Sequence, residues 1–237
     1  MSYKTPPTAR CQLSDSTTQI ITSTTVAYPV FFDTNDDIKG ITHDVTGATV
    51  TITNASPGVV TWTGHTLVVG DGVKFTTDGA LPTGLVAGTA YFVSSVASNT
   101  FQVSAVPGGT AVNTSSAGSG THTAKSTNRL VLRSTGVGLV SISIIAEGGL
   151  NDHVDVWPRL DGTDIARSNT IIQIAKASAE TLIAVPFIVS TSTTGQKLEL
   201  WWRGETTGCS LFATAAGAAP TRPACPSAII TIVKVSK

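Results

Sequence analysis

The stretch Pro220-Thr-Arg-Pro-Ala-Cys-Pro-Ser-Ala-Ile-Ile-Thr-Ile-Val-Lys-Val-Ser-Lys237 indicates the fold class. Its prolines, Pro220, Pro223 and Pro226, stiffen the chain and exclude a helix at this point. From about Ser227 to the end, both alternating sets of side chains are largely apolar. We therefore expect a central β-strand that the rest of the chain covers on both faces.

The composition is that of a neutral protein with few charges. Hydrophobic residues make up 41% of the 237 residues and charged residues 13%, and the formal net charge is +0. Such a surface lacks the basic field that attracts nucleic acids and anionic membranes, so we expect neither as a partner. Near-zero charge weakens self-repulsion, which suits a component of an assembly. The first residues do not predict a signal peptide, and no apolar run reaches membrane-spanning length.

The beginning and the last half of the chain predict comparatively long strands. Residues 1–17 are interpreted as an irregular N-terminal arm, followed by strands over Thr18–Thr22 and Val26–Phe32, where Pro29 favours an edge position. The later predicted strands are Arg129–Arg133, Gly138–Ala146, Val154–Leu160, Thr170–Ile174, Glu180–Ser190, Lys197–Arg203, a short run at Cys209–Ala213 and the terminal strand. No window shows a convincing helical period.

Residues 45–125 differ in style, because Ser, Thr and Gly dominate and Arg is absent. Five short strands are predicted there: Thr49–Thr53, Val59–Thr63, Gly72–Thr76, Ala90–Ser94 and Thr100–Ser104. Closely spaced turn signals such as Pro57-Gly58 separate them, and the Gly/Ser-rich residues 115–120 end the segment. This pattern is typical of a small β-barrel or sandwich.

The fold prediction is an all-β chain with a module inserted in a loop. Residues 18–44 and 126–237 together supply roughly eight to ten strands, which an antiparallel jelly-roll sandwich packs economically because it hides sheet edges. Residues 45–125 form the inserted small β domain, placed where insertions are tolerated.

No pattern in the sequence predicts catalysis, a cofactor or a strong metal site. Asp33-Thr-Asn-Asp-Asp37 is interpreted as a polar turn, with a weak cation site as the alternative, because the glycine and closing glutamate of a calcium loop are missing. The four histidines are His43, His65, His122 and His153, and they lack paired ligand spacing. There is no nucleophile elbow, phosphate loop or placed carboxylate pair, so we expect no enzyme.

Cysteine and tryptophan residues leave two questions open. Cys11, Cys209 and Cys225 are expected as reduced thiols, with a Cys209–Cys225 bridge as the alternative. Trp201 and Trp202 face opposite ways on one strand, so one is expected in the core and the other at a subunit interface or a sugar-stacking platform. Trp62, in the middle segment, is equally ambiguous.

Several short runs carry a resemblance to tailed-phage virion proteins whose C-terminal domains are like the C1q and tumour-necrosis-factor jelly rolls. The runs are Asp33-Thr-Asn-Asp, Asn128-Arg-Leu-Val-Leu-Arg-Ser-Thr-Gly136, Trp157-Pro-Arg-Leu-Asp-Gly-Thr-Asp164, Ser168-Asn-Thr170, Leu198-Glu-Leu-Trp-Trp202 and Pro220-Thr-Arg-Pro. The segment from Gly64 to Leu85, with Tyr91-Phe-Val and Asn99-Thr-Phe-Gln-Val, is similar to a small β module of phage fibre and structural proteins. The resemblance implies a homotrimer in a virion, assembled in the host cytoplasm.

Three functions follow as hypotheses. The first is a capsid decoration (cement) protein that contacts the phage major capsid protein or other virion proteins without covalent bonds. The alternative is a receptor-binding tip or short tail fibre that recognises a host surface glycan through loops. A carbohydrate-binding module outside phage biology is the weakest of the three.

Overall fold

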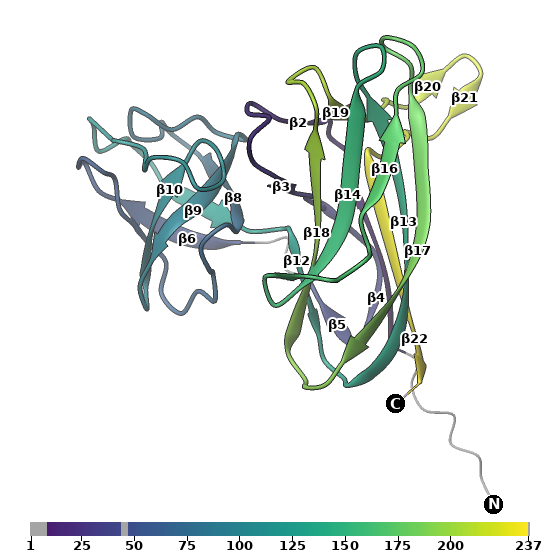
Figure 1. The fold of residues 1–237 in the computed structure, drawn as a ribbon. Helices are drawn as coiled ribbons and strands as arrows, with labels where there is room; N and C mark the ends of the chain where they lie inside the picture. The colour runs from purple at the N-terminus through teal and green to yellow at the C-terminus, as the bar shows by residue number, and fades with distance from the viewer. Residues whose placement is uncertain (1–8, 44–46, 237) are drawn as a thin grey trace, which may run out of the picture. The chain divides into compact units, whose positions relative to one another are not determined.

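The computed structural model describes residues 9–43 and 47–236, and all regular structure in these ranges is β-strand (Figure 1). The all-β prediction is confirmed, and no helix of the described ranges is long and apolar enough to cross a membrane. The chain divides into two compact units. The described residues of unit 1 fall within Met1–Thr25, Pro29–His43 and Arg129–Lys237, and those of unit 2 within Val26–Tyr28 and Asp44–Asn128.

Unit 1 contains two large sheets, of which sheet A is built around the longest strand of the chain. Its path runs β2-β19-β13-β22-β1-β4, and β17 pairs with β13 along almost the whole of that strand. The strands are β1 (Arg10–Asp15), β2 (Gln19–Ile20), β4 (Thr34–Lys39), β13 (Gly136–Glu147), β17 (Thr181–Thr191), β19 (Ser210–Leu211) and β22 (Ala228–Ser236). The terminal strand therefore lies inside the sheet, between β13 and β1, as the sequence predicts.

Sheet B follows the path β15-β14-β18-β12-β5, with β16 pairing with β14. Its strands are β5 (Ile41–Thr42), β12 (Arg129–Leu132), β14 (His153–Leu160), β15 (Thr163–Asp164), β16 (Thr170–Gln173) and β18 (Gln196–Gly204). Three further short strands are β3 (Tyr28–Pro29), where the sequence predicts a longer strand, and the hairpin of β20 (Gly217–Ala218) and β21 (Thr221–Arg222).

The two sheets form two layers in Figure 1, and their facing side chains make the core of unit 1. Alternation places Ile142 and Ile144 of β13 inward, and Leu200 and Trp202 of β18 inward, all at most 3% exposed. A residual cavity of about 30 Å³ is lined from both layers, by Leu198 on one side and residues of β13 and β22 on the other. Each large aliphatic side chain buried in this way stabilises the fold by about 1.5–3 kcal/mol.

Two segments at the N-terminus differ from their prediction. Residues 1–17 are expected as an irregular arm, but Arg10–Asp15 forms β1, which hydrogen-bonds β22 on one side and β4 on the other. The segment that is predicted as a polar turn, Asp33–Asp37, contributes most of β4. The reason is its position, since β4 is an edge strand whose polar side chains remain largely exposed while its backbone pairs with β1. The rest of the predicted arm, residues 1–8, lies outside the described residues.

Unit 2 is a closed six-stranded barrel with its own core. The strand order is β10-β7-β6-β11-β8-β9. The strands are β6 (Ala48–Ile52), β7 (Val60–Thr61), β8 (Gly72–Thr77), β9 (Ala90–Val96), β10 (Thr100–Ser104) and β11 (His122–Lys125). Five of them match predicted strands, and β11 was missed because its four residues follow a Gly/Ser-rich run. Phe75, Phe101 and Tyr91 are the largest side chains of its core.

Candidate functional site

The outer face of sheet A carries an uncharged surface that spans three adjacent strands. Four outward positions on each of β17, β13 and β22 make it up, and we call it the sheet A patch. Its residues are Leu182, Ala184, Pro186 and Ile188, then Leu139, Ser141, Ser143 and Ile145, then Ile229, Thr231, Val233 and Val235. Among these twelve residues none is charged.

Three large apolar side chains of the sheet A patch lie next to one another. Leu139 pairs with Ile188 on one side and with Val233 on the other, which places three apolar side chains in one row across the sheet. Ile188 is 71% exposed, and Leu182 and Val235 are each 61% exposed. Exposed apolar side chains that lie together in this way are typical of interaction surfaces.

Charged side chains begin at the border of the patch. On β1, which follows β22 in the sheet, Arg10 pairs with Asp37 of β4 through Nε and Oδ2 at 2.5 Å. The sequence predicts that β22 is covered on both faces, and this prediction is wrong for one face. Ile230 and Ile232 are buried, but Val233 and Val235 point away from the core. Both alternating sets of side chains on β22 are largely apolar, which was interpreted as burial of both faces in the core. The same pattern is also expected when one face lies in the core and the other forms an interface, so it could have revealed the patch.

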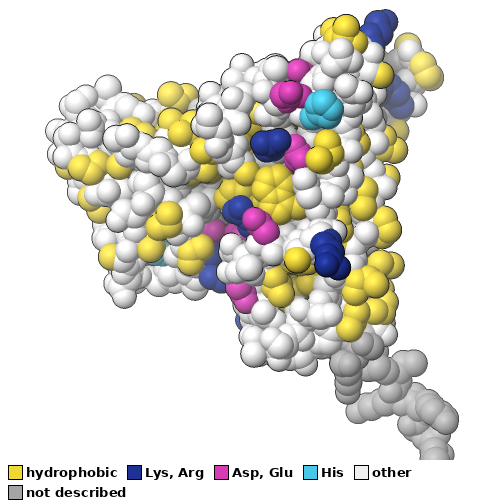
Figure 2. Space-filling model, in the orientation of Figure 1, with side chains coloured by type: hydrophobic (Ala, Val, Ile, Leu, Met, Phe, Trp, Pro, Cys, Tyr) yellow, Lys and Arg dark blue, Asp and Glu magenta, His cyan; other side chains and the backbone are white. Residues whose placement is uncertain are grey.

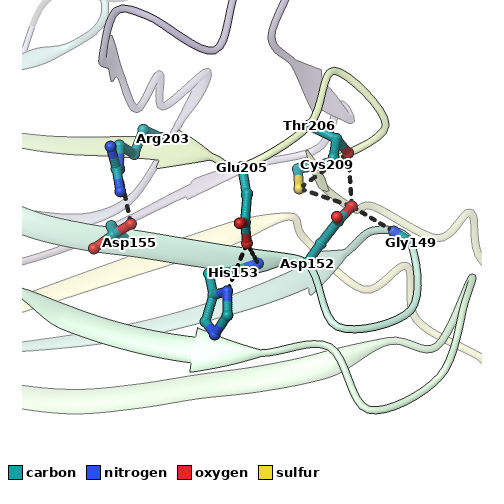
Figure 3. A network of polar contacts seen from close by, with 8 residues as sticks. All are labelled: Gly149, Asp152, His153, Asp155, Arg203, Glu205, Thr206 and Cys209. Carbon is teal, nitrogen blue, oxygen red and sulfur yellow. Dashed lines mark hydrogen bonds and ion pairs between the residues drawn. The ribbon is translucent and has the colours of Figure 1, made fainter.

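A network of polar contacts joins the start of β14 to the end of β18 in sheet B (Figure 3). Asp152 Oδ2 accepts hydrogen bonds from Thr206 Oγ1 at 2.6 Å, from Gly149 N at 2.7 Å and from Cys209 Sγ at 3.5 Å. The Thr206 hydrogen bond is the main cause that lowers the pKa of Asp152. Burial raises the pKa of the Cys209 thiol, so the arrangement does not activate this cysteine as a nucleophile.

The neighbouring His153 belongs to a different contact from Asp152, because adjacent strand residues point to opposite faces. His153 Nδ1 lies 2.6 Å from Glu205 Oε2, and its backbone N–H donates to the same oxygen at 3.1 Å. These hydrogen bonds lower the pKa of the exposed Glu205. The residues therefore join the strand ends, and they do not form a catalytic dyad with Asp152.

The three tryptophans proposed as binding residues are packed in the structure. Trp202 is 1% exposed in the core, and Trp201, on the opposite face of β18, is 6% exposed. The Arg159 guanidinium carbon lies 3.9 Å from the centroid of the Trp201 ring and covers it. Trp62 packs against the barrel core of unit 2 beside Phe101. Neither Trp201 nor Trp202 therefore offers an open ring for stacking. The alternation of side chains along the strand placed Trp201 on the outer face, but it could not show that Arg159 covers the ring.

The other candidate residues have local partners. His43 Nδ1 lies 2.6 Å from Asn35 Oδ1, and His122 Nδ1 lies 2.9 Å from Thr77 Oγ1. His65 packs edge-on against Phe101. The three cysteines are free, and within the described ranges no group of three or more His, Cys, Asp or Glu side chains is placed to hold a metal ion.

Cys11 is a second buried thiol. It lies in β1 on the core side of sheet A, where burial raises its pKa to about 12. A thiol with so high a pKa remains protonated and unreactive at neutral pH. Cys11 is therefore a small apolar core residue in this structure.

Comparisons with known proteins give no family. No protein-family model matches the chain, and no curated protein matches it. Solved structures that resemble it include PRD1 vertex protein P5, at 12% identity over 71% of this chain and 99% of that chain, with a TM-score of 0.24. Infectious bursal disease virus Gx strain matches at 9% identity over 99% of this chain and 70% of that chain, with a TM-score of 0.27. TM-scores this low carry no argument about the fold or the function of this chain.

Proposed function

We propose that this chain is a structural protein of a phage virion, a homotrimeric jelly roll that decorates the capsid and stabilises it through non-covalent contacts. The proposal joins three supports: the sequence resemblance to tailed-phage virion proteins, the strand order of unit 1, and the sheet A patch. The patch is the main support, because its exposed apolar side chains would be buried by contact with another copy of the chain.

The strand order supports the jelly-roll interpretation. With β4 and the two-residue strands set aside, unit 1 has eight strands, β1, β12, β13, β14, β16, β17, β18 and β22. In this sequence of eight, the first pairs with the last, the second with the seventh, the third with the sixth and the fourth with the fifth. Such nested antiparallel pairs, distributed over two sheets, are what a jelly roll made of two Greek keys requires.

The sheet A patch supports self-association. Contacts between identical subunits bring copies of the same surface together, and any charge in it would meet a like charge or lose its water. A patch of twelve uncharged residues with exposed Ile188, Leu182 and Val235 avoids both costs. Its removal from water supplies the hydrophobic driving force for association.

The near-neutral surface and the sequence resemblance support a place on the capsid. A trimer matches the threefold sites of a shell, where one protein contacts several capsid subunits at once. A protein that binds only the assembled shell stabilises it by mass action and raises its melting temperature.

Two measurements on the purified chain test this proposal. Light scattering during size exclusion is expected to give three times the mass of one chain. Addition of the chain to empty capsids of its phage is expected to raise the capsid melting temperature. A monomer at micromolar concentration would remove the trimer, and capsids that neither bind the chain nor gain stability would remove the decoration role.

A receptor-binding tip is the second candidate, and an open cleft on the outer side of sheet B favours it. This alternative predicts that the chain binds host cells and that a free sugar competes with the binding. The capsid experiment separates the two functions, since a tip protein has no reason to bind the shell.

A further inference from the structure

An open cleft of about 700 Å³ lies on the outer side of sheet B, entirely within unit 1. Its walls come from β14, β15, β16, β18 and the segment between β15 and β16. The residues that matter for a ligand are Asp155, Trp157, Ile165, Asn169, Ile171 and Arg203. In Figure 2 the face over β14 and β18 shows hydrophobic side chains flanked by basic and acidic ones. The cleft therefore combines an apolar wall with a polar one, which is the usual make-up of a small-molecule site.

The polar wall is organised by the buried carboxylate of Asp155. Its Oδ1 accepts a hydrogen bond from Asn169 Nδ2 at 2.8 Å, and its Oδ2 accepts one from Arg203 Nε at 2.9 Å. The Asp155 side chain is 5% exposed, whereas that of Arg203 is 55% exposed. Asp155 is thus committed to its two neighbours and acts as a positioning residue.

This arrangement leaves a donor and an acceptor available for a ligand. A carboxylate accepts hydrogen bonds only, so the Asn169 amide directs its NH₂ group to Asp155 and retains its Oδ1 as a free acceptor. The two terminal nitrogens of Arg203 have no other partner within the described part of the chain and remain donors. Asn169 and Arg203 are held by the same carboxylate, which keeps this donor and this acceptor close together.

The apolar wall is organised by Trp157, which is half-buried on the outer face of β14. The Arg159 guanidinium carbon lies 5.9 Å from the centroid of the Trp157 ring, farther than the 3.9 Å at which it covers Trp201. Trp157 Nε1 donates to Asp164 Oδ1 at 2.7 Å, and Arg159 donates to the same oxygen. Burial alone would raise the pKa of Asp164, but the hydrogen bonds from Arg159 and Trp157 outweigh it and lower the pKa. The carboxylate is therefore ionised at neutral pH and fixes the indole ring. Ile171, which is 58% exposed, extends the apolar wall.

We propose that this cleft binds a saccharide, with a pyranose ring against Trp157 and two neighbouring hydroxyl groups on Asn169 and Arg203. A sugar hydroxyl both donates and accepts a hydrogen bond, so a vicinal pair matches the free Asn169 Oδ1 and the Arg203 terminal nitrogens. The C–H face of the ring packs against the indole face, and apolar burial of this kind adds to the hydrogen bonds. Both cleft carboxylates are already paired with arginines, so the site needs no cation.

The inference does not depend on the virion role, because any protein with this cleft would have the same chemistry. The experiment is a calorimetric titration of the full chain with galactose, N-acetylglucosamine and glucuronate as probes. Glycerol and acetate serve as controls for a simple polyol and a simple anion. We expect saturable binding of at least one of the three sugars and none of glycerol or acetate. Acetate binding equal to that of glucuronate would overturn the proposal, since it would identify a simple anion site at the arginines.

Variants locate the binding. Asn169→Ala and Arg203→Ala each remove one hydrogen-bonding partner at an exposed side chain, and each is expected to weaken the sugar by about tenfold. Trp157→Ala is expected to weaken it at least as much, and Trp157→Phe is expected to retain part of the affinity. Arg222→Ala is the matched control, because Arg222 is an exposed arginine of unit 1 outside the cleft. Denaturation midpoints verify that each variant folds.

Two results would sink the saccharide site. One is the absence of saturable binding for all three sugars. The other is binding that Asn169→Ala and Arg203→Ala leave unchanged while both variants remain folded. Neither result bears on trimer formation or capsid binding, which are measured separately.

Discussion

The two sheets of unit 1 share one core but present opposite chemistry outward. The sheet A patch, on the outer face of sheet A, has no charged residue and exposes Leu139, Ile188 and Val233 in one row. The outer face of sheet B carries Asp155 with Arg203, and Arg159 against Trp201. The difference shows that the inward side chains of the strands determine the fold. The outward side chains can vary without changing it, so they determine which partner or ligand each face can bind.

The distinction has a physical basis in the cost of removing charges from water. Burial of a face against a copy of itself costs the least free energy when the face carries no charge. The sheet A patch carries none. A face that remains in water can keep ion pairs, because water and the partner both compensate each charge. Sheet B therefore tolerates arginines and carboxylates that would weaken an interface of identical subunits.

The largest effect is expected for the core that both faces share. Trp202→Ala should lower the free energy of unfolding by about 3–5 kcal/mol, because it removes the largest fully buried side chain of unit 1. Chemical denaturation followed by circular dichroism measures the change. Trp62→Ala in unit 2 is the matched control and should cost less, since Trp62 is only half-buried. A cost below about 1 kcal/mol for Trp202→Ala would mean that the two layers do not rest on a common core.

The next effect distinguishes the two outer faces. Ile188→Asp should convert the oligomer to a monomer, because it places a carboxylate inside the sheet A patch at an expected cost of roughly 1–3 kcal/mol or more per contact. Ile171→Asp is the matched control, since Ile171 is similarly exposed but belongs to sheet B. Light scattering should give a reduced mass for the first variant only. If both variants have the same oligomer mass, the sheet A patch has no role in assembly.

A smaller effect concerns the polar network at the end of sheet B. The pKa of Asp152 is lowered in the folded chain, so its ionised form contributes stability above the unfolded pKa of about 3.9. That contribution is lost as the pH falls through the lower, folded pKa. Thr206→Val removes the main donor, so it should cost about 1 kcal/mol at neutral pH, and the gap to the wild type should close below about pH 4.

Denaturation at a series of pH values measures this gap. Thr193→Val, at an exposed position on a turn, controls for the loss of a hydroxyl group alone. A gap that stays constant down to acid pH would show that Thr206 acts through packing, and not through the charge of Asp152.

The smallest effect is expected for the exposed pair of His153 and Glu205. Glu205→Gln removes the charge but keeps a hydrogen-bonding oxygen, and water screens exposed ion pairs strongly. The denaturation midpoint should therefore not move measurably in physiological salt. A shift as large as that of Thr206→Val would show that the network of Figure 3 acts as one unit.

The sequence predicted the class of structure well because strand alternation and turn chemistry are local properties. Five of the six barrel strands, and the position of β22 inside its sheet, follow from runs of alternating residues between Gly- and Pro-containing turns. The strands β1, β4 and β11 were missed, since their largely polar residues have no strong strand propensity of their own. Pairing with a distant strand decides their structure.

The candidate sites could not be predicted from the sequence in the same way. Alternation showed that β22 is apolar on both sides, but only the tertiary structure decided that Val233 and Val235 face away from the core. Likewise, Asp155, Asn169 and Arg203 come from two strands and a connecting segment, and the register of β14 with β18 brings the first and the last together. The sequence by itself determined an all-β chain with few charges. Which faces stay open was decided by contacts between residues far apart in the chain, because coverage of a strand depends on its neighbours and not on its own residues.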